Sequence, residues 1–600
     1  MKSKSTLFWL VLTVTLAAAI WVSENYFQPS DTGAKPLFAG LRGERVTDIG
    51  IVPTAAREIS VTRSNNIWLL QKPIIYPAQA AAIDGLLAAL QKLTPLVSFS
   101  AGDMNAHKNA DAEFGFDNPQ FTINVASGDQ SWHLNVGNKT APGDGVYVRI
   151  VGAPGAYVTD ASWLQFLPRD AAEWRDTTLV DMPATPDWLV ITNGTQAIEL
   201  RRDATNRLWR MVRPLQARAD NLRILTALQQ LRTAKVSQFI SDDPKADLTS
   251  YGLDPAALDI WLGNGTNLLT AIHAGKDVAG APGEIFARRE GWSTVVTTAK
   301  EPLAAWRGTV NDFRDPNLLE LTAPPAEIEV RGENSFTLQQ RASNVWAVAG
   351  EKFPVDASQV QVLIRTLAGL RIADFVQDVV TASGLQGFGL ATPSRQITLR
   401  AAAGDTNSVI AQLLFGGSNT NNNQIYVKRG DEDFVYAMSP DNMGQLLLPG
   451  DYYRDHRVWS FSETNVAEVT LHQNGKIRQM IRNGTNDWSL AAGSQGMITP
   501  PAVEETVHRL GQLTVMAWIG RKFNSLEDIG ITTNSLSVTV ELKTGEKYSV
   551  DFGKEVHLPS QNQSTALATV TLEGARWAFV FPPLLCQLVA ESLTIPPDAP

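Results

Sequence analysis

The sequence predicts an α+β protein made of four tandem copies of one unit, each copy holding an antiparallel sheet and one main helix. Three observations lead to this prediction. The first is a set of landmarks that recurs in a fixed order along the chain. The second is the nearly constant length of chain between successive copies of each landmark. The third observation is length, because the chain far exceeds the roughly 250–300 residues at which a single core stops growing. We therefore expect a row of domains behind one N-terminal membrane segment.

The first landmark is a tryptophan that closes a short strand pair near the start of each copy. Most of these tryptophans stand directly beside leucine, isoleucine or valine, which favours packing in a core. The alternative is a set of aromatic platforms on which envelope glycans stack. The four, at nearly equal intervals, are Trp68, Trp209, Trp346 and Trp488.

The second landmark is an amphipathic helix. Its apolar residues recur close to the pattern i, i+3, i+4, i+7, which predicts one buried face packed on a sheet. In the first two copies these residues are Ile83, Leu86, Leu87, Leu90 and Leu93, and then Ile224, Leu225, Leu228 and Leu231.

The third landmark is a glycine between apolar or aromatic residues, which indicates a positive φ or a close approach of two backbones. The four, again at nearly equal intervals, are Gly115, Gly252, Gly389 and Gly530. Alternating strands follow each glycine, as at 121–125 and 132–136, and such alternation across a glycine-containing turn predicts a hairpin. A further strand then carries an aromatic residue in the first three copies: Tyr147, Phe286 and Tyr426.

The last landmark is an arginine–aspartate pair that ends the first three copies. With almost the same interval between successive copies, the pairs are Arg175 with Asp176, Arg314 with Asp315, and Arg454 with Asp455. The fourth copy lacks the pair, as a terminal repeat without a following neighbour would. We therefore interpret the pair as a structural device of the junction with the next copy; contact with a ligand or partner is the alternative.

The N-terminus predicts a membrane anchor. Lys2 and Lys4 precede an uncharged stretch whose apolar part is 7–22, so we expect residues 5–23 to cross the inner membrane once as an uncleaved signal anchor. Cleavage after the alanines at 17–19 is the alternative. The lysines place the N-terminus in the cytoplasm and the bulk of the chain in the periplasm or another extracytoplasmic space.

These landmarks set the expected domain boundaries. Residues 1–26 form the cytoplasmic tip and anchor helix, and 27–45 form a spacer containing glycine, proline and serine. The expected copies are 46–183, 184–322, 323–462 and 463–600, the last being terminal and atypical.

The chain resembles the bacterial domain-of-unknown-function family 4340 in three features. They are the string Tyr251–Pro255 (YGLDP) after the helix, the early strand with its tryptophan, and the late arginine–aspartate pair. The resemblance covers all four copies and is strongest in the first two. It implies an N-terminally anchored envelope protein, associated with transporter-like systems of the ATP-binding-cassette class, including gliding-type auxiliary components. It implies no established activity, so no catalytic residue is carried over.

Composition and motifs restrict the chemistry. The net charge is −10 without a basic run, which excludes nucleic acid as a main partner. The single Cys586 and seven dispersed histidines offer no local metal motif, and no nucleophile elbow or phosphate-binding loop is present. We predict no catalytic, metal or cofactor residues.

The expected function is a non-enzymatic scaffold or accessory subunit with membrane-protein partners in an envelope or transporter-like system. Two alternatives remain open: a protein that binds envelope glycan, and a hydrolase whose site is assembled from distant residues.

Overall fold

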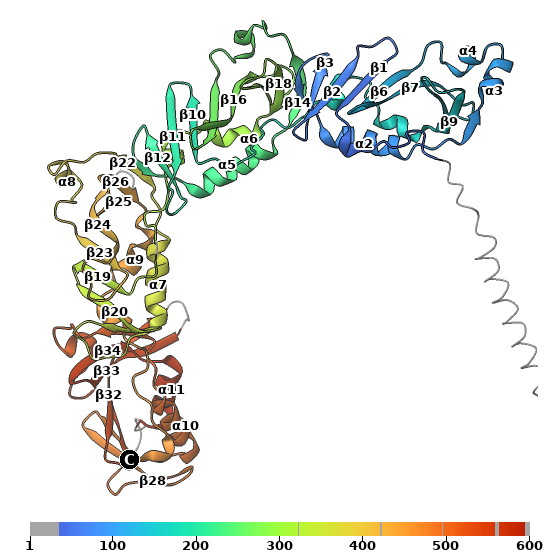
Figure 1. Ribbon diagram of the computed structural model, residues 1–600. Coiled ribbons are helices and arrows are strands. Elements are labelled where there is room, and N and C mark those ends of the chain that lie inside the picture. The colour runs from blue at the N-terminus through green and yellow to red at the C-terminus, as the bar shows by residue number, and fades with distance from the viewer. Residues whose placement is uncertain (1–34, 322, 420–422, 495, 559–562, 595–600) are drawn as a thin grey trace, which may run out of the picture. The chain divides into compact units, whose positions relative to one another are not determined.

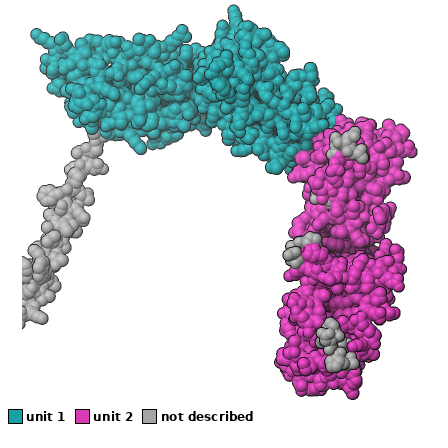
Figure 2. All heavy atoms as spheres, turned by 180° about the vertical axis from the view of Figure 1, so that it is seen from behind, with its two compact units in different colours: residues 1–314 teal, residues 315–600 magenta. Residues whose placement is uncertain are grey.

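The computed structural model describes residues 35–594 except 322, 420–422, 495 and 559–562. The chain divides into two compact units, 1–314 and 315–600, coloured separately in Figure 2. Each unit contains two antiparallel sheets, so the described residues form four sheet domains, called repeats 1 to 4 below. This confirms the α+β prediction. No helix within the described ranges is long and apolar enough to span a membrane, and the predicted anchor at 5–23 lies outside those ranges.

Repeat 1 is a nine-stranded sheet in the order β4-β3-β2-β1-β6-β7-β8-β9-β5. Its elements are β1 (Asp48–Pro53), β2 (Ile59–Ser64), β3 (Ile67–Lys72), β4 (Tyr76–Pro77), α2 (Ala80–Gln91), β5 (Val97–Phe99), α3 (Ala101–Ala106), α4 (Ala110–Phe114), β6 (Phe121–Ser127), β7 (Gln130–Lys139), β8 (Gly145–Ile150) and β9 (Ala156–Asp160).

Repeat 2 has the same strand order, β13-β12-β11-β10-β15-β16-β17-β18-β14. Its elements are β10 (Trp188–Asn193), β11 (Gln196–Arg202), β12 (Trp209–Arg213), β13 (Ala217–Arg218), α5 (Asn221–Thr233), β14 (Val236–Ser241), β15 (Leu258–Asn264), β16 (Asn267–Asp277), β17 (Glu284–Arg289), β18 (Val295–Ala299) and α6 (Glu301–Ala304).

Repeats 3 and 4 keep this order with eight strands each, without a counterpart of the two-residue β4. Repeat 3 comprises β19 (Glu327–Gly332), β20 (Phe336–Ala342), β21 (Val345–Val348), α7 (Ala357–Ala368), β22 (Asp374–Gln377), α8 (Gly384–Gly387), β23 (Arg395–Arg400), β24 (Val409–Asn419), β25 (Gln424–Arg429), β26 (Val435–Met438) and α9 (Met443–Leu446). Repeat 4 comprises β27 (Val466–Gln473), β28 (Lys476–Gly484), β29 (Asp487–Leu490), α10 (Pro500–Gly511), β30 (Ala517–Gly520), β31 (Ser537–Leu542), β32 (Lys547–Leu558), β33 (Gln563–Leu572), β34 (Ala575–Val580) and α11 (Pro583–Ser592).

In every repeat the main helix connects opposite edges of its sheet. In repeat 1, α2 follows β4 at one edge and leads to β5 at the other, and Figure 1 shows α2 lying along one face of the sheet. Ile83, Leu86, Leu87 and Leu90 of α2 are buried in the core, as the periodicity predicts. Because the helix covers one face, strand residues alternate between buried and more exposed, as in β1.

The helix of repeat 2 departs from the predicted stripe. Its buried residues are Ile224, Ala227 and Leu231, whereas Leu225 is 48% exposed, so the prediction for Leu225 was wrong. Successive helical residues point about 100° apart, so a leucine directly after Ile224 turns away from the sheet. The short Ala227 fills the i+3 position instead.

The predicted spacer also differs in its second half. Phe38 and Leu41 are buried in the core of repeat 1, and the N–H of Leu37 donates to the carbonyl of Leu93 at 2.9 Å. Residues 35–41 therefore pack on the end of α2 and belong to the body of repeat 1.

Candidate functional site: the junctions between repeats

Arg175, the arginine of the first predicted pair, joins repeats 1 and 2. It comes from the end of repeat 1, and its guanidinium donates to both carboxylate oxygens of Asp242 in repeat 2, at 3.1 and 2.7 Å. The Arg175 side chain is 7% exposed and that of Asp242 is 31% exposed. The hydroxyl of Thr294 donates to the same carboxylate at 3.0 Å. Two parallel charge-assisted bonds fix the angle between the partners as well as their distance.

Aromatic rings surround this ion pair. Tyr76 of repeat 1 lies edge-on to Phe239 and Trp292 of repeat 2, with ring centroids 5.4 Å away in both cases. The Arg175 guanidinium lies 4.6 Å from the centroid of Phe239 and 5.8 Å from that of Tyr76. Burial raises the pKa of the Tyr76 phenol, so its ring remains neutral at ordinary pH. Arg289, also in repeat 2, donates to the carbonyl of Thr178 in the linker at 3.2 Å.

Arg454 has the same role between repeats 3 and 4. Its guanidinium donates to both carboxylate oxygens of Glu573 at 2.8 and 3.0 Å, and its side chain is 3% exposed. It lies 4.3 Å from the ring centroid of Trp577, 5.1 Å from that of Trp518 and 5.3 Å from that of Phe353. The same mixture of one ion pair and several aromatic faces therefore recurs in the second unit.

A second arginine strengthens the junction in this unit. Arg521 of repeat 4 binds Glu351 of repeat 3 through two nitrogens, at 3.0 and 2.7 Å, and reaches Asp451 at 2.8 Å. Hydrogen bonds to these carboxylates raise the pKa of Arg521, with the bond to Glu351 contributing most. A cavity of about 640 Å³ lies beside this network and is lined by residues of both repeats.

The carboxylate of the aspartate in each pair shapes the linker. One carboxylate oxygen accepts the N–H two residues later, at 2.9 Å in all three cases: Thr178 to Asp176, Asn317 to Asp315, and Arg457 to Asp455. Such a local bond holds the chain in a turn directly after the arginine.

The linker then pairs with the end of the next helix. The N–H groups of Leu179, Leu318 and Val458 donate to the carbonyls of Ala234, Leu370 and Leu513, respectively. Two residues further along the receiving segment, the N–H groups of Val236, Ile372 and Val515 donate back to the carbonyls of Thr177, Pro316 and His456. Repeats 2, 3 and 4 thus receive the preceding linker in one register.

Arg314, the arginine of the second pair, ends the first compact unit. It is 3% exposed, pairs with Ala219 in an antiparallel bridge, and donates to the side-chain oxygen of Asn311 at 3.2 Å. Its backbone therefore sits in its own repeat as that of Arg175 does, which bridges to Ala78.

The four landmark tryptophans are buried. Trp68 and Trp209 are 1% exposed, and Trp346 and Trp488 are 4% exposed. Trp488 donates its indole N–H to Glu504 at 2.7 Å. A stacking platform needs an open ring face, and these rings have none.

The four landmark glycines adopt positive φ angles of 81°, 68°, 67° and 81°, which confirms the backbone prediction. A Cβ on Gly252 would lie 2.9 Å from the backbone nitrogen of Lys276. Sequence reasoning missed the reason for this proximity, which is a second glycine in each repeat: Gly137, Gly275, Gly416 and Gly553. A Cβ on any of these four would lie 2.0–2.2 Å from the carbonyl oxygen of the residue before the first glycine.

This second glycine stands at a β-bulge in the second strand of the hairpin, where the register shifts in all four repeats. The signal was present in the sequence, because these glycines recur along the chain at nearly the same interval as the landmark glycines. The aromatic residue before the first glycine packs on the late-strand aromatic: Phe114 stacks on Tyr147 at 4.3 Å, and Phe388 meets Tyr426 at 4.9 Å.

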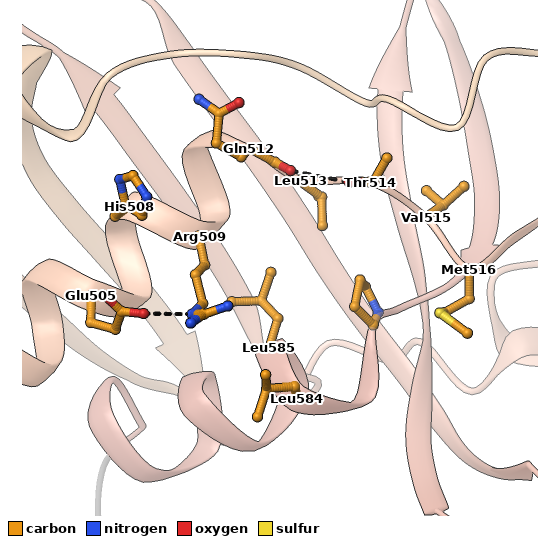
Figure 3. A pocket seen from close by; sticks show the side chains of 11 residues that line it. Glu505, His508, Arg509, Gln512, Leu513, Thr514, Val515, Met516, Leu584 and Leu585 are labelled. Atoms are coloured by element: carbon orange, nitrogen blue, oxygen red, sulfur yellow. Dashed lines mark hydrogen bonds and ion pairs between the residues drawn. The ribbon is translucent and has the colours of Figure 1, made fainter. Parts of the chain in front are cut away.

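A pocket of about 550 Å³ lies on repeat 4 between α10 and the start of α11 (Figure 3). On α10, Arg509 donates to Glu505 one helical turn away at 2.6 Å, and Leu584 and Leu585 of α11 line the apolar side of the pocket. His508 pairs with Glu463 at 3.0 Å, and this hydrogen bond lowers the pKa of the Glu463 carboxyl. Two of the polar side chains that line the pocket are thus paired with each other, and a third, His508, is paired with a residue outside the lining.

No cluster of three histidine, cysteine, aspartate or glutamate residues fit to hold a metal ion occurs in the part of the chain that the structure describes. Cys586 is partly buried, and burial raises the pKa of its thiol.

A family model described as "Domain of unknown function (DUF4340)" matches residues 68–205, 209–341 and 346–522, more than half of the chain. The chain belongs to this family. Every match of the DUF4340 model begins at a landmark tryptophan, Trp68, Trp209 or Trp346. The first match therefore runs from the third strand of repeat 1 into the first hairpin of repeat 2, so the matched unit is offset from the folded one.

Comparisons with curated proteins and with solved structures gave no significant match.

Proposed function

We propose that this DUF4340 protein is a membrane-anchored, extracytoplasmic and non-enzymatic scaffold or accessory subunit of an envelope or transporter-like system. The observation that carries the proposal is the use of the recurrent arginine–aspartate motif. Arg175 and Arg454 are both buried in ion pairs with the next repeat, and their aspartates hold the linkers. The most conspicuous polar residues of the repeat thus serve to join sheets.

Joining sheets in this way makes each pair of repeats one compact unit. A compact unit of two sheets suits a protein that holds other subunits at a distance from the membrane. Anchoring in the inner membrane by residues 5–23 and membrane-protein partners of the ATP-binding-cassette or gliding type belong to the same proposal, and rest on the apolar N-terminus and on the family resemblance.

Crosslinking in the native cell, followed by purification in mild detergent and partner identification, tests the scaffold. We expect a membrane protein to co-purify with the full chain and to be lost when residues 1–26 are deleted. Recovery of the chain without any membrane-protein partner would contradict the proposal.

A glycan-binding role would need aromatic faces other than the four landmark tryptophans, because those are buried. A glycan array and a peptidoglycan pull-down with the full chain distinguish the two functions. The scaffold proposal predicts no retention in either assay.

A further inference from the structure

The outer edge of repeat 1 is built differently from the equivalent edges that receive a preceding repeat. In repeats 2 and 4 the edge strand places an aromatic residue opposite the neighbouring strand: Phe239 faces Val296, and Trp518 faces Phe579. Both rings pack in a junction. The corresponding residue of β5 is Ser98, which faces Tyr157 and is exposed.

The backbone at this edge is also altered. The N–H of Leu37 donates to the carbonyl of Leu93, just as the N–H of Leu179 donates to the carbonyl of Ala234. Residues 35–41 therefore take the position that a linker takes in the later repeats. In repeat 2 the N–H of Val236, two residues after Ala234, donates back to the linker. The residue two places after Leu93 in repeat 1 is Pro95, which has no N–H and cannot make this bond. The adjoining turn, 151–155 (VGAPG), contains neither the acid nor the aromatic residue that the equivalent turns supply as Glu573 and Trp292.

Apolar side chains are exposed at this same edge. Leu96 is 65% exposed, Val97 48% and Val151 52%. Lys35 and Lys92 are exposed close by in the chain, and Asp103, the nearest following carboxylate, already accepts the N–H and hydroxyl of Ser100. The apolar patch formed by Leu96, Val97 and Val151 thus has basic neighbours along the chain. The counterparts of Leu96 and Val97 are also exposed in the repeats that follow another repeat: Ser237 and Gln238 in repeat 2, which are polar, and Met516 and Ala517 in repeat 4.

Chain length limits what can cover it. The predicted anchor ends at residue 23, and the described part of the chain begins at Lys35. The eleven residues 24–34 between them reach at most about 40 Å when extended. The docking point of Leu37 on Leu93 is three residues from Leu96, so the patch lies next to the point where this tether begins.

We propose that this edge of repeat 1, formed by Leu96, Val97 and Val151 with Lys35 and Lys92, docks on the surface of the bilayer that anchors the chain. The proposal rests on the anchoring in the proposed function. Apolar side chains at the start of the edge strand β5, in the loop before it and in the turn after β8 enter the interfacial layer, and the lysines meet anionic headgroups.

Site-specific quenching tests this docking. The full chain, with Cys586→Ser, receives one cysteine by Leu96→Cys and is labelled with an environment-sensitive fluorophore. It is then reconstituted in vesicles of phosphatidylethanolamine and phosphatidylglycerol that carry brominated chains. The matched control is Ile67→Cys, because Ile67 is 66% exposed and lies on β3, towards the opposite edge of the same sheet. We expect quenching about threefold stronger at position 96 than at position 67.

Three outcomes overturn the proposal, and they are distinguishable. Equal quenching at both positions, while the chain floats with the vesicles, removes the docking surface but leaves the anchor intact. A chain that does not float removes both docking and anchor. A photocrosslinker at position 96 that captures a protein in native membranes, without lipid quenching, assigns the edge to a protein partner. As a further support, Leu96→Asp with Val97→Asp should abolish quenching of a label at position 151 while flotation is unchanged.

Discussion

The junction between repeats 1 and 2 resembles the junction between repeats 3 and 4 in its buried arginine, but the carboxylate that pairs with this arginine differs. Both use a buried arginine from the end of the earlier repeat. Its partner in the first case is Asp242, directly after the edge strand β14, and in the second case Glu573, in the turn before β34. The arginine positions correspond, whereas the acids come from different loops.

This difference shows what the junction fixes and what it leaves free. The arginine is held by its backbone, since Arg175 bridges to Ala78 and Arg454 to Val355 in the same antiparallel way. A carboxylate needs only to reach the end of that fixed side chain, so any nearby loop can supply it. The junction in the second unit also adds Arg521, which ties Glu351 to Asp451.

The largest effect is expected at Arg454. Replacing it by methionine keeps the apolar stem but removes the ion pair and its contacts with three aromatic rings. We expect a loss of about 2–4 kcal/mol in the free energy of unfolding, measured by urea titration with tryptophan fluorescence. The control is Arg457→Met, an exposed arginine in the same linker, which should change stability by less than about 0.5 kcal/mol. Equal losses of stability in Arg454→Met and Arg457→Met would contradict the special role that we assign to the buried arginine of the junction.

Arg175→Met should cost less, about 1.5–3 kcal/mol, because Asp242 keeps its bond from the Thr294 hydroxyl and fewer rings face the guanidinium. Hydrogen exchange at the N–H of Val236, which bonds to the linker, gives the local readout. The exposed Arg169→Met is the matched control. A loss larger than that of Arg454→Met would reverse the order we assign to the two junctions.

Double-mutant cycles sharpen the comparison of the two acids. We expect coupling energies of about 1–2 kcal/mol for Arg175→Met with Asp242→Asn, and a similar value for Arg454→Met with Glu573→Gln. The two values should agree because both pairs are bidentate and both acids are about one-third exposed. Coupling near zero in either cycle would mean that the rings, not the charges, hold that junction.

The smallest expected effect concerns pH. The short helix Val310–Phe313 before Arg314 begins with a capping box, and hydrogen bonds from Thr309 lower the pKa of Asp312. Because the pKa of Asp312 is lower in the folded protein than the unfolded value of roughly 4, its carboxylate stabilises the fold at pH values above that unfolded value. This stabilisation is lost as the pH falls through the folded pKa. Asp312→Asn should therefore cost about 0.5–1 kcal/mol at pH 7 and converge with wild type towards pH 2–3.

The equivalent helix of repeat 3, Gly450–Tyr453, follows Pro449, which has neither the N–H nor the hydroxyl that Thr309 donates to Asp312, and it provides the internal contrast. Asp451→Asn is not a suitable control there, since Asp451 binds Arg521. A pH-independent effect of Asp312→Asn would show that the carboxylate charge is irrelevant to the cap.

Several local features could be read from single residues because their causes are local. Positive φ at Gly115 follows from the need for a left-handed residue after a short helix. The stripe of α2 follows from helical periodicity, and the place of Arg454 at the end of its repeat follows from recurrence along the chain. The same logic failed at Leu225, where two adjacent apolar residues left the buried one ambiguous.

The sequence by itself determined the number of repeats, and in each repeat the place of the early strands, the main helix and the hairpin after the landmark glycine. These depend on periodicity and on local backbone preference, which a single chain displays directly. Only the tertiary structure decided which acid meets each arginine, that Gly275 makes room for the carbonyl of Tyr251, and that residues 35–41 fold onto repeat 1. These depend on distances between segments far apart in the chain, and those distances exist only once the helix has crossed its sheet and the linker has docked.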